Sequence, residues 1–478
     1  MHKKSARVRL FSSLIPSHAP DREPCFRENS VRDTDRALWP LALTSFERFL
    51  LHGEDLNYPA TFYVELHLEG QFDRTALQEA LRVAVLRHPL LCATVVQTGW
   101  RESWQPASEP PHALWQSTTD APGPPLGRWI DLRRECGLRI WVREQPQLGD
   151  VLYLQFHHSC TDGLGAGRFI IDLMSEYSRL VCRQPDLVTS SADLLALKNR
   201  DRFRRFGQTS RWQKTLNAYR FHVLTPTPLA APNHLPVPSG STAPVIATHV
   251  FDRDETDCFV SKTATLGGCS INDVGLALLF RAVSLWQKSR GRESPSQRLR
   301  ILMPIDLREA GDRFGPATNR VGFSFPSRSI KECDNWHQLL NSLREEIRFI
   351  RRTRLGMDFI NGLKVTDTIP GLLPMLLRSP GCMATTLLTN FGQTRRYEQF
   401  FPVADRSMLF GNMRLHHIVA TPPISRACRV GFGMCLTSGR LVLTVQCDPA
   451  LFDNKSAGEL LQVFVSIWRQ WVDDRMTV

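Results

Sequence analysis

One short segment, in which a strand runs into two histidines and then a helix, constrains the fold of this chain most. Residues 151–156 are apolar and strand-like, and they lead directly into His157-His158-Ser159-Cys160-Thr161-Asp162-Gly163. Helical spacing of apolar residues resumes from Gly165 and continues to Leu180. A histidine at a strand end can act as a general base because its ordinary pKa lies near neutral pH. Asp162, four residues after His158, can orient the imidazole.

Length and composition indicate a globular protein with more than one core. A chain of 478 residues is expected to form two domains of about 200 residues each. The net charge of +12 favours anionic partners, which include a phosphorylated cofactor, an acidic carrier protein, anionic lipid and nucleic acid. The 12 cysteines include no CxxC pair, which argues against a zinc ribbon or a secreted disulfide scaffold and for a reducing compartment. No apolar stretch approaches the roughly 18 residues that span a bilayer.

Four segments follow from the distribution of charge and proline. Residues 1–38 are expected to be a flexible basic segment, with a transit-type leader as the alternative. Residues 39–224 form the predicted N-terminal lobe, which carries the two histidines. Residues 225–244 contain six prolines and are predicted to be an extended linker. Residues 245–478 form the predicted C-terminal lobe.

Local patterns predict most of the secondary structure. Apolar alternation predicts strands at 62–69, 138–144, 151–156, 245–251 and 299–305, and a hairpin of 428–436 with 440–447. Helical periodicity predicts helices that follow Asp73, Gly165, Ser270 and Asp334, and a last helix through Trp468. Helices and strands alternate without a strict βαβ rhythm, which predicts α/β sandwiches with mixed sheets.

Residues 198–222 are rich in arginine and contain five aromatic side chains: Phe203, Phe206, Trp212, Tyr219 and Phe221. We interpret this stretch as an amphipathic, partly solvated helix. A role at a nucleic acid or a membrane surface is the alternative.

Six stretches, taken in order, point to a family. They are Pro40-Leu41-Ala42-Leu43-Thr44-Ser45-Phe46-Glu47-Arg48-Phe49; Arg87-His88-Pro89-Leu90-Leu91; the segment His157–Gly163; Ser270-Ile271-Asn272-Asp273-Val274; Met303–Arg308 with Asn319-Arg320-Val321-Gly322; and Thr389-Asn390-Phe391-Gly392. Together they resemble the HHxxxDG acyltransferase superfamily, which shares the fold of chloramphenicol acetyltransferase and includes peptide-synthetase condensation domains, wax ester synthases and polyketide-associated acyltransferases. The resemblance covers about residues 40–470 and rests on this order, because only the histidine segment is specific alone.

The resemblance implies an α/β fold of two chloramphenicol acetyltransferase-like sandwich lobes with mixed sheets and a channel between them. In such a site His158 accepts the proton of an acceptor hydroxyl or amine, which attacks a thioester carbonyl. Asp162 is structural and pairs with an arginine, for which Arg308 is the candidate. His157 supports the strand end, because neighbouring strand residues face opposite sides. Gly163 is expected to allow a tight turn where a side chain would crowd the histidine.

The resemblance also implies partners. Thr389 or Asn390 is the candidate oxyanion donor. Acyl-CoA or an acyl-phosphopantetheine group serves as co-substrate, and neither a permanently bound cofactor nor a metal is expected. The acceptor is a small alcohol or amine. An acidic acyl carrier protein and a peripheral membrane contact are compatible with the charge, whereas nucleic acid is not expected.

Other interpretations of these residues fit less well. A metal site from His157, His158, Cys160 and Asp162 fails because consecutive residues at a strand end diverge. The run Gly163-Leu164-Gly165-Ala166-Gly167 is GxGxG rather than the GxGxxG of a dinucleotide loop. The second histidine pair, His416-His417, has Thr421 and Pro422 where the Asp and Gly of the signature would stand.

Two features of the chain depart from the family pattern. The DFGWG motif of plant-type members is absent, and Cys92 stands where arginine is common. We therefore expect a cytoplasmic acyltransferase of lipid or secondary metabolism, with an O-acyltransferase preferred. An amide-forming condensation domain and a non-catalytic docking module are the alternatives, and a basic nucleic-acid-binding protein is a more distant one.

Overall fold

The computed structural model describes residues 38–117, 129–145, 147–184, 194–203, 225–232, 244–292, 294, 296–378 and 381–473. Two predicted segments lie wholly or largely outside these ranges: the basic N-terminal segment and the arginine-rich stretch with Phe206, Trp212, Tyr219 and Phe221. Of the proline-rich linker, residues 225–232 and Pro244 are described. Within the described residues no helix is both long and apolar enough to cross a membrane.

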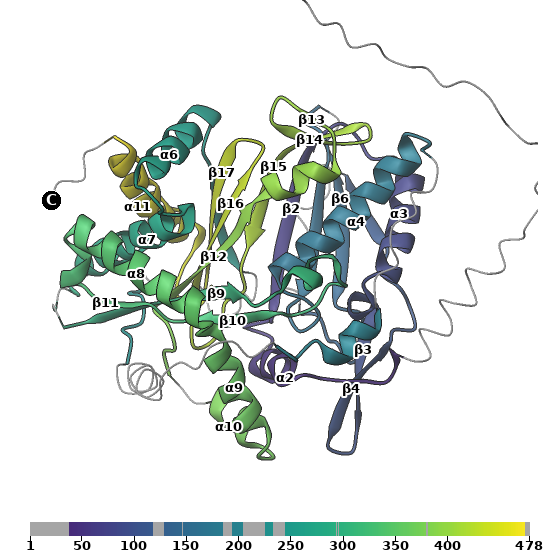
Figure 1. Ribbon diagram of the computed structural model, residues 1–478, viewed down its shortest axis with the longest axis horizontal. Helices are drawn as coiled ribbons and strands as arrows, with labels where there is room; N and C mark the ends of the chain where they lie inside the picture. The colour runs from purple at the N-terminus through teal and green to yellow at the C-terminus, as the bar shows by residue number, and fades with distance from the viewer. Residues whose placement is uncertain are drawn as a thin grey trace, which may run out of the picture.

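Two seven-stranded mixed sheets form the frame of the molecule (Figure 1). The first sheet has the strand order β13 (Val403–Ala404), β14 (Ser407–Phe410), β15 (Met413–Thr421), β2 (Thr61–Glu69), β7 (Val151–His157), β6 (Leu138–Glu144) and β5 (Ala113–Ser117). Its β5–β6 pair is parallel, and its other pairs are antiparallel. Two helices pack against it, α3 (Arg74–Leu86) and α4 (Gly163–Val181).

The second sheet lies beside the first and is built from the C-terminal half of the chain. Its order is β10 (Val321–Ser324), β9 (Arg298–Asp306), β12 (Thr386–Gln393), β16 (Val430–Thr437), β17 (Arg440–Cys447) and β8 (Val245–Val250), with β11 (Ser327–Ser329) also pairing with β9. The central strand β12 runs parallel to both neighbours. Its helices are α6 (Arg253–Thr265), α7 (Ile271–Lys288), α8 (Trp336–Thr353) and α11 (Asn454–Val472).

Smaller elements complete the two lobes. A three-stranded sheet contains β1 (Leu41–Ala42), β4 (Arg101–Pro106) and β3 (Ala93–Thr98). Three further helices are α2 (Ser45–Gly53), α9 (Gly356–Asp367) and α10 (Leu372–Leu377). Short 3-10 helices are η1 (Pro89–Cys92), η2 (Leu194–Asn199), η3 (Ala310–Phe314), η4 (Lys331–Cys333) and η5 (Thr394–Phe400).

Each large sheet has its own hydrophobic core, which is what two lobes require. One core joins α3 and α4 to the first sheet, and the other joins α7, α8 and α11 to the second. The mixed α/β class predicted from the sequence is therefore confirmed. The two sheets do not follow the predicted boundary at residue 245 strictly, because β13, β14 and β15 come from the C-terminal half and extend the first sheet.

Strand β15 joins the lobes. It pairs antiparallel with β2 over most of its length, and its Ala420 carbonyl accepts a hydrogen bond from Thr444 Oγ1 of the second sheet at 2.8 Å. Gly433 on β16 permits this approach, since a Cβ there would stand 2.2 Å from the Ala420 carbonyl oxygen. The sequence analysis did not predict this strand.

Helix starts follow the predicted capping chemistry, with one correction. The Asp73 side chain accepts from Ala76 N, and Ser270 and Asp273 form the predicted capping box at the start of α7. Asp334 was the predicted cap of α8, but Asn335 occupies that position and accepts from Gln338 N. Asp334 instead pairs with Lys288 at 2.6 Å.

Removal of the cap tests how much α7 contributes to the second lobe. Ser270→Ala is expected to lower the free energy of unfolding by about 1 kcal/mol, because Asp273 N loses the Ser270 hydroxyl as an acceptor and keeps only the Ser270 carbonyl. Ser466→Ala, at an exposed position inside α11, is the matched control and is expected to change it by less than about 0.5 kcal/mol. Equal denaturation midpoints for the two variants would contradict the assignment.

Candidate active site between the lobes

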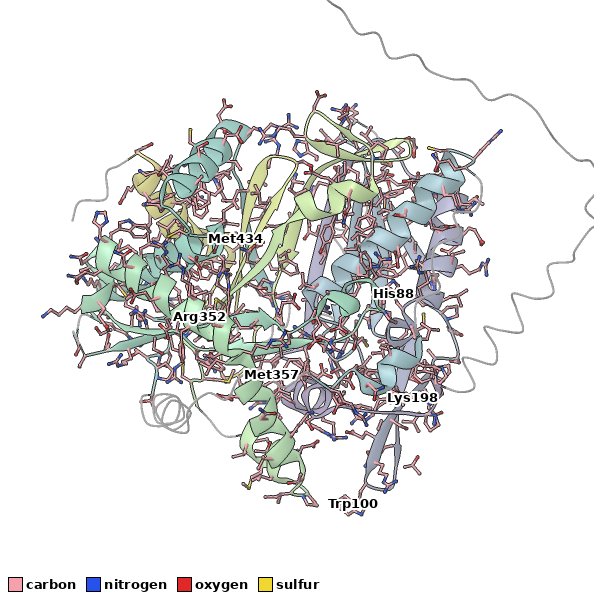
Figure 2. All side chains as sticks on the ribbon, viewed as in Figure 1. His88, Trp100, Lys198, Arg352, Met357 and Met434 are labelled. Carbon is pink, nitrogen blue, oxygen red and sulfur yellow. The ribbon has the colours of Figure 1, made fainter. Side chains whose placement is uncertain are left out.

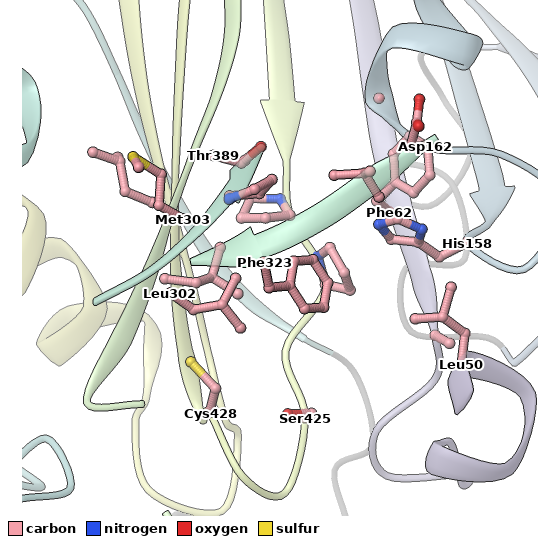
Figure 3. A pocket seen from close by; sticks show the side chains of 18 of the residues that line it. Leu50, Phe62, His158, Asp162, Leu302, Met303, Phe323, Thr389, Ser425 and Cys428 are labelled. Carbon is pink, nitrogen blue, oxygen red and sulfur yellow. The ribbon is translucent and has the colours of Figure 1, made fainter. Parts of the chain in front are cut away.

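A cavity of about 550 Å³ lies between the two lobes (Figure 3). The first lobe contributes His158, Asp162 and Gly163, and the second contributes Thr389 and Asn390 from β12. The structure thus brings these predicted residues of both lobes to one space. Most of the remaining lining is apolar, and it includes Phe49, Leu50, Phe62, Leu302, Met303, Phe323, Leu388 and Cys428.

His158 stands directly after β7 and is held by its backbone. Its N–H donates to the Ala60 carbonyl at 2.7 Å, which continues the pairing of β7 with β2. The Asn319 Nδ2 donates to the carbonyls of His158 and Ser159, at 2.7 and 2.9 Å. The ring meets the edge of Phe62 with centroids 5.2 Å apart, and Nδ1 is buried. These contacts leave Nε2 as the nitrogen that a ligand in the cavity can reach.

The surroundings of His158 favour the neutral ring. Burial lowers its pKa below the ordinary value of 6.5, because a charged imidazolium loses its hydration there. Its own backbone carbonyl and the Asp162 carboxylate oppose this shift but do not reverse it. The ring is therefore unprotonated at neutral pH, which is the form that can accept a proton.

His157 faces away from the cavity and is fully buried. Its Nδ1 accepts a hydrogen bond from Ser159 N at 3.1 Å, so Nε2 carries the proton and donates to Glu54 Oε1 at 3.0 Å. The other Glu54 oxygen accepts from Ala60 N at 3.0 Å. The second histidine of the signature therefore links α2 to the end of β7, where its neighbour is presented to the cavity.

Asp162 and Arg308 form a bidentate ion pair across the two lobes. Arg308 Nη2 donates to Oδ1 at 2.8 Å and Nη1 donates to Oδ2 at 2.9 Å. The backbone N–H groups of Gly165 and Arg320 also donate to the carboxylate, at 2.9 and 2.8 Å. Asp162 thus caps α4 and binds the end of β9, with its carboxylate directed away from the cavity (Figure 3).

This arrangement decides between the two predicted roles of Asp162. Its hydrogen bonds go to Arg308, Gly165 and Arg320 and not to the imidazole, so the hypothesis that it orients His158 directly is wrong. Burial alone would raise the pKa of Asp162, but the Arg308 charge and the donated hydrogen bonds outweigh burial and lower it. The pKa of Arg308 is raised by the same pairing, against the effect of its own burial.

Gly163 is needed for a reason that differs from the prediction. A Cβ at this position would stand 2.7 Å from Cε1 of Phe391, so the ring of the second lobe occupies the space that a side chain would need. The backbone of Gly163 does not adopt a positive φ, which means that a tight turn is not the reason. The crowding therefore involves Phe391 rather than His158.

Thr389 and Asn390 border the cavity from β12. The pairing of β12 with β16 shifts register between Asn390 and Gly392, and this irregularity places Phe391 over Gly163. The Asn390 Oδ1 accepts from Gly392 N at 2.8 Å, so its amide N–H₂ group is the part that can donate to a ligand.

Two residues that hold the site, Glu54 and Asn319, reach it only through the tertiary fold. Glu54 lies 103 residues before His157, and no local pattern connects the two. Asn319 belongs to one of the stretches that resemble the family, and it meets the carbonyls of His158 and Ser159 about 160 residues earlier in the chain. In the described part of the chain no cluster of three His, Cys, Asp or Glu residues is arranged to hold a metal ion.

Comparison with known sequences yields limited similarity. No family model matches the chain. Two uncharacterized proteins of Mycobacterium tuberculosis, one from strain CDC 1551 / Oshkosh and one from strain H37Rv, are each 27% identical over 145 residues. The match covers 29% of this chain and 33% of each relative, so the chain spans about a third of the length of the curated relatives it matches.

Solved structures resemble the chain over almost its full length. The first condensation domain of the calcium-dependent antibiotic synthetase, bound to a substrate analogue, has a TM-score of 0.67 at 14% identity and covers 92% of this chain and 97% of its own. A mutant of the starter condensation domain of rhizomide synthetase, bound to C8-CoA and Leu-SNAC, has a TM-score of 0.61 at 14% identity. The match covers 92% of this chain and 96% of that domain. Polyketide synthase associated protein 5 of Mycobacterium tuberculosis has a TM-score of 0.59 at 15% identity. The match covers 90% of this chain and 97% of that protein.

The chain therefore has the condensation-domain fold, which consists of two chloramphenicol acetyltransferase-like lobes. The predicted resemblance is confirmed at the level of the fold.

The ion pair between the lobes is expected to be essential for stability. Arg308→Met leaves the Asp162 carboxylate buried without its partner and should lower the free energy of unfolding by about 3–5 kcal/mol. Arg426→Met removes a surface pair with Asp55 and should cost less than about 1 kcal/mol. Urea unfolding of both variants tests the difference, and a small effect of Arg308→Met would contradict a buried, mutually dependent pair.

Proposed function

We propose that this protein transfers an acyl group from a thioester, of CoA or of a phosphopantetheine carrier, to a hydroxyl acceptor, with His158 as the general base. The observation that carries the proposal is a neutral, cavity-facing imidazole at the seam of two lobes, held by backbone contacts on both sides. Its position next to an apolar space of about 550 Å³ fits an acyl chain better than a polar substrate.

The proposed step is direct transfer. Nε2 of His158 takes the proton of the acceptor hydroxyl while its oxygen forms a bond to the thioester carbonyl carbon. The tetrahedral intermediate then collapses, the carbon–sulfur bond breaks, and the leaving thiolate receives the proton from the imidazolium. The imidazole is neutral again at the end of the step, and no covalent intermediate forms on the protein.

Stabilisation of the intermediate is assigned to the second lobe. The Thr389 hydroxyl and the Asn390 amide are the candidate donors to the oxyanion, because both border the cavity opposite His158. Asp162, Arg308 and Asn319 act as positioning residues, since they hold the loop that carries His158 and do not line up with the reacting atoms. His157 has the same kind of role through Glu54.

The structural neighbours support the classes of donor. One of them is a starter condensation domain in complex with C8-CoA, and another is a condensation domain in complex with a substrate analogue. CoA and a carrier-bound thioester therefore both stay in the proposal for this chain. Amide formation is the second candidate reaction, favoured by the condensation-domain neighbours, and products from alcohol and amine acceptors distinguish the two.

Removal of the base tests the proposal. Purified protein is incubated with a panel of acyl-CoAs and of alcohols, and acylated products are measured by mass spectrometry. His158→Ala should lower kcat by about 10²–10⁴-fold with an unchanged melting temperature, because only the proton acceptor is lost. His416→Ala, in the histidine pair outside the cavity, should leave kcat unchanged. Measurable and equal turnover by His158→Ala and the unaltered protein would exclude His158 as the base, whereas no product from either protein would favour a docking module.

The pKa of His158 sets the pH dependence of kcat/KM. Because burial lowers its pKa, the ring is already neutral at pH 6.5 and above, and kcat/KM should fall only as the pH drops below that value. A profile of kcat/KM between pH 5 and 8 measures this acidic limb. A midpoint above 6.5 would indicate an imidazolium favoured by its surroundings and would contradict the assignment.

A further inference from the structure

Two projections carry exposed apolar side chains at the same edge of the molecule. One is the helical hairpin of α9 and α10, and the other is the turn between β3 and β4 (Figure 1). Trp100, at the tip of that turn, marks the lower edge in the view of Figure 2. The hairpin extends in the same direction, so one flat surface can touch both.

The hairpin displays apolar residues on its outer side. Val365 is 66% exposed, Ile369 53%, Met375 62% and Leu376 48%. The inner side of the same hairpin is already filled by Ile360, Leu363 and Leu373, which are buried in the core of the second lobe. Single exposed apolar residues are ordinary, but several gathered on one projection indicate a surface that contacts an apolar partner.

Trp100 adds an anchor with a different chemistry. Its side chain is 97% exposed and follows Gly99, whose positive φ forms the turn. Tryptophan combines a large apolar ring with an N–H donor and favours the boundary between water and lipid headgroups. Arg101 is exposed directly beside it.

The charges around these residues fit an anionic partner. Between residues 361 and 378 the only carboxylate is Asp367, which is neutralised by Arg48. In the same stretch Lys364 already binds Asp201 Oδ2 at 3.3 Å, whereas Arg378 is exposed, and the whole chain has a net charge of +12. Basic residues next to apolar ones are the combination that binds an anionic lipid surface.

We propose that the α9–α10 hairpin and the Trp100 turn form a membrane-docking surface for an anionic lipid bilayer. Ile369, Met375 and Trp100 enter the headgroup region, while Arg101 and Arg378 contact lipid phosphates. Nothing in this contact requires a spanning segment, because the apolar side chains reach only the interface.

The docking surface is continuous with the cavity. Leu377 of α10 lines the cavity and packs beside Gly53 of α2, while Phe49 and Leu50 of α2 line the same space. An apolar acceptor or acyl chain leaving the bilayer would therefore meet α10 and α2 before His158. This part rests on the proposed acyl transfer, whereas the lipid contact stands without it.

Vesicle binding tests the surface in the full chain. Sedimentation is measured with phosphatidylcholine vesicles that contain about 30% phosphatidylglycerol, in the absence of any thioester. The double variant Ile369→Asp/Met375→Asp should lower the bound fraction about tenfold or more, and Trp100→Ser should lower it about threefold. Leu148→Asp, at an 80% exposed position in the β6–β7 turn, should bind like the unaltered protein. Pure phosphatidylcholine vesicles and high salt should both weaken binding.

Several results would overturn the docking surface. The unaltered protein would not sediment with the vesicles, or the double variant would bind as strongly as the unaltered protein with the same melting temperature. A change from dimer to monomer in the double variant, without vesicle binding by the unaltered protein, would assign the surface to contacts between copies instead. Acyl transfer to a water-soluble alcohol separates the two proposals. The rate of this transfer should be the same in the double variant and the unaltered protein. If no protein catalyses the transfer but the unaltered protein still binds vesicles, only the proposed reaction is excluded.

Discussion

The buried ion pair of Asp162 and Arg308 holds the two lobes in the relation that the cavity requires. It joins the start of α4, on the first sheet, to the end of β9, on the second. Arg308 also donates to the Thr318 carbonyl, and Asp162 accepts from Arg320 N, so both partners fix the residues around Asn319. Asn319 in turn holds the carbonyls of His158 and Ser159. The position of the imidazole thus depends on a charge pair that it does not touch.

Asp162 stays charged and His158, four residues earlier, stays neutral, because hydrogen-bond donors surround the carboxylate. The Asp162 carboxylate receives four hydrogen bonds, two of them from a guanidinium, and this compensates for its lost hydration. His158 has no comparable compensation for a positive charge, so burial keeps it neutral. A charged support beside a neutral base is what the proposed proton transfer requires. Loss of Arg308 should therefore lower the stability of the fold, whereas loss of His158 should lower turnover.

Local sequence patterns predicted the elements whose partners are near in the chain or whose caps are local. The strand at 62–69, the strands at 138–144 and 151–156, and the hairpin across Ser438-Gly439 appear where periodicity and turn residues placed them. Strand β15 was missed because its partner β2 lies about 350 residues earlier and its own pattern is interrupted at His416 by a bulge. The cap of α8 was misplaced by one residue because Asp334 and Asn335 both have capping side chains.

By itself, the sequence determined the mixed α/β class, the strand–histidine–helix unit and the pairing candidates Asp162 and Arg308, because these depend on short-range periodicity, caps and a recognisable order of motifs. Only the tertiary structure decided why residue 163 has no side chain and which groups hold the loop that carries His158. Glu54, Asn319 and Phe391 meet the signature across distances in the chain that no local pattern spans. Their roles exist only once two lobes pack together, since burial and contact between remote segments arise at that step.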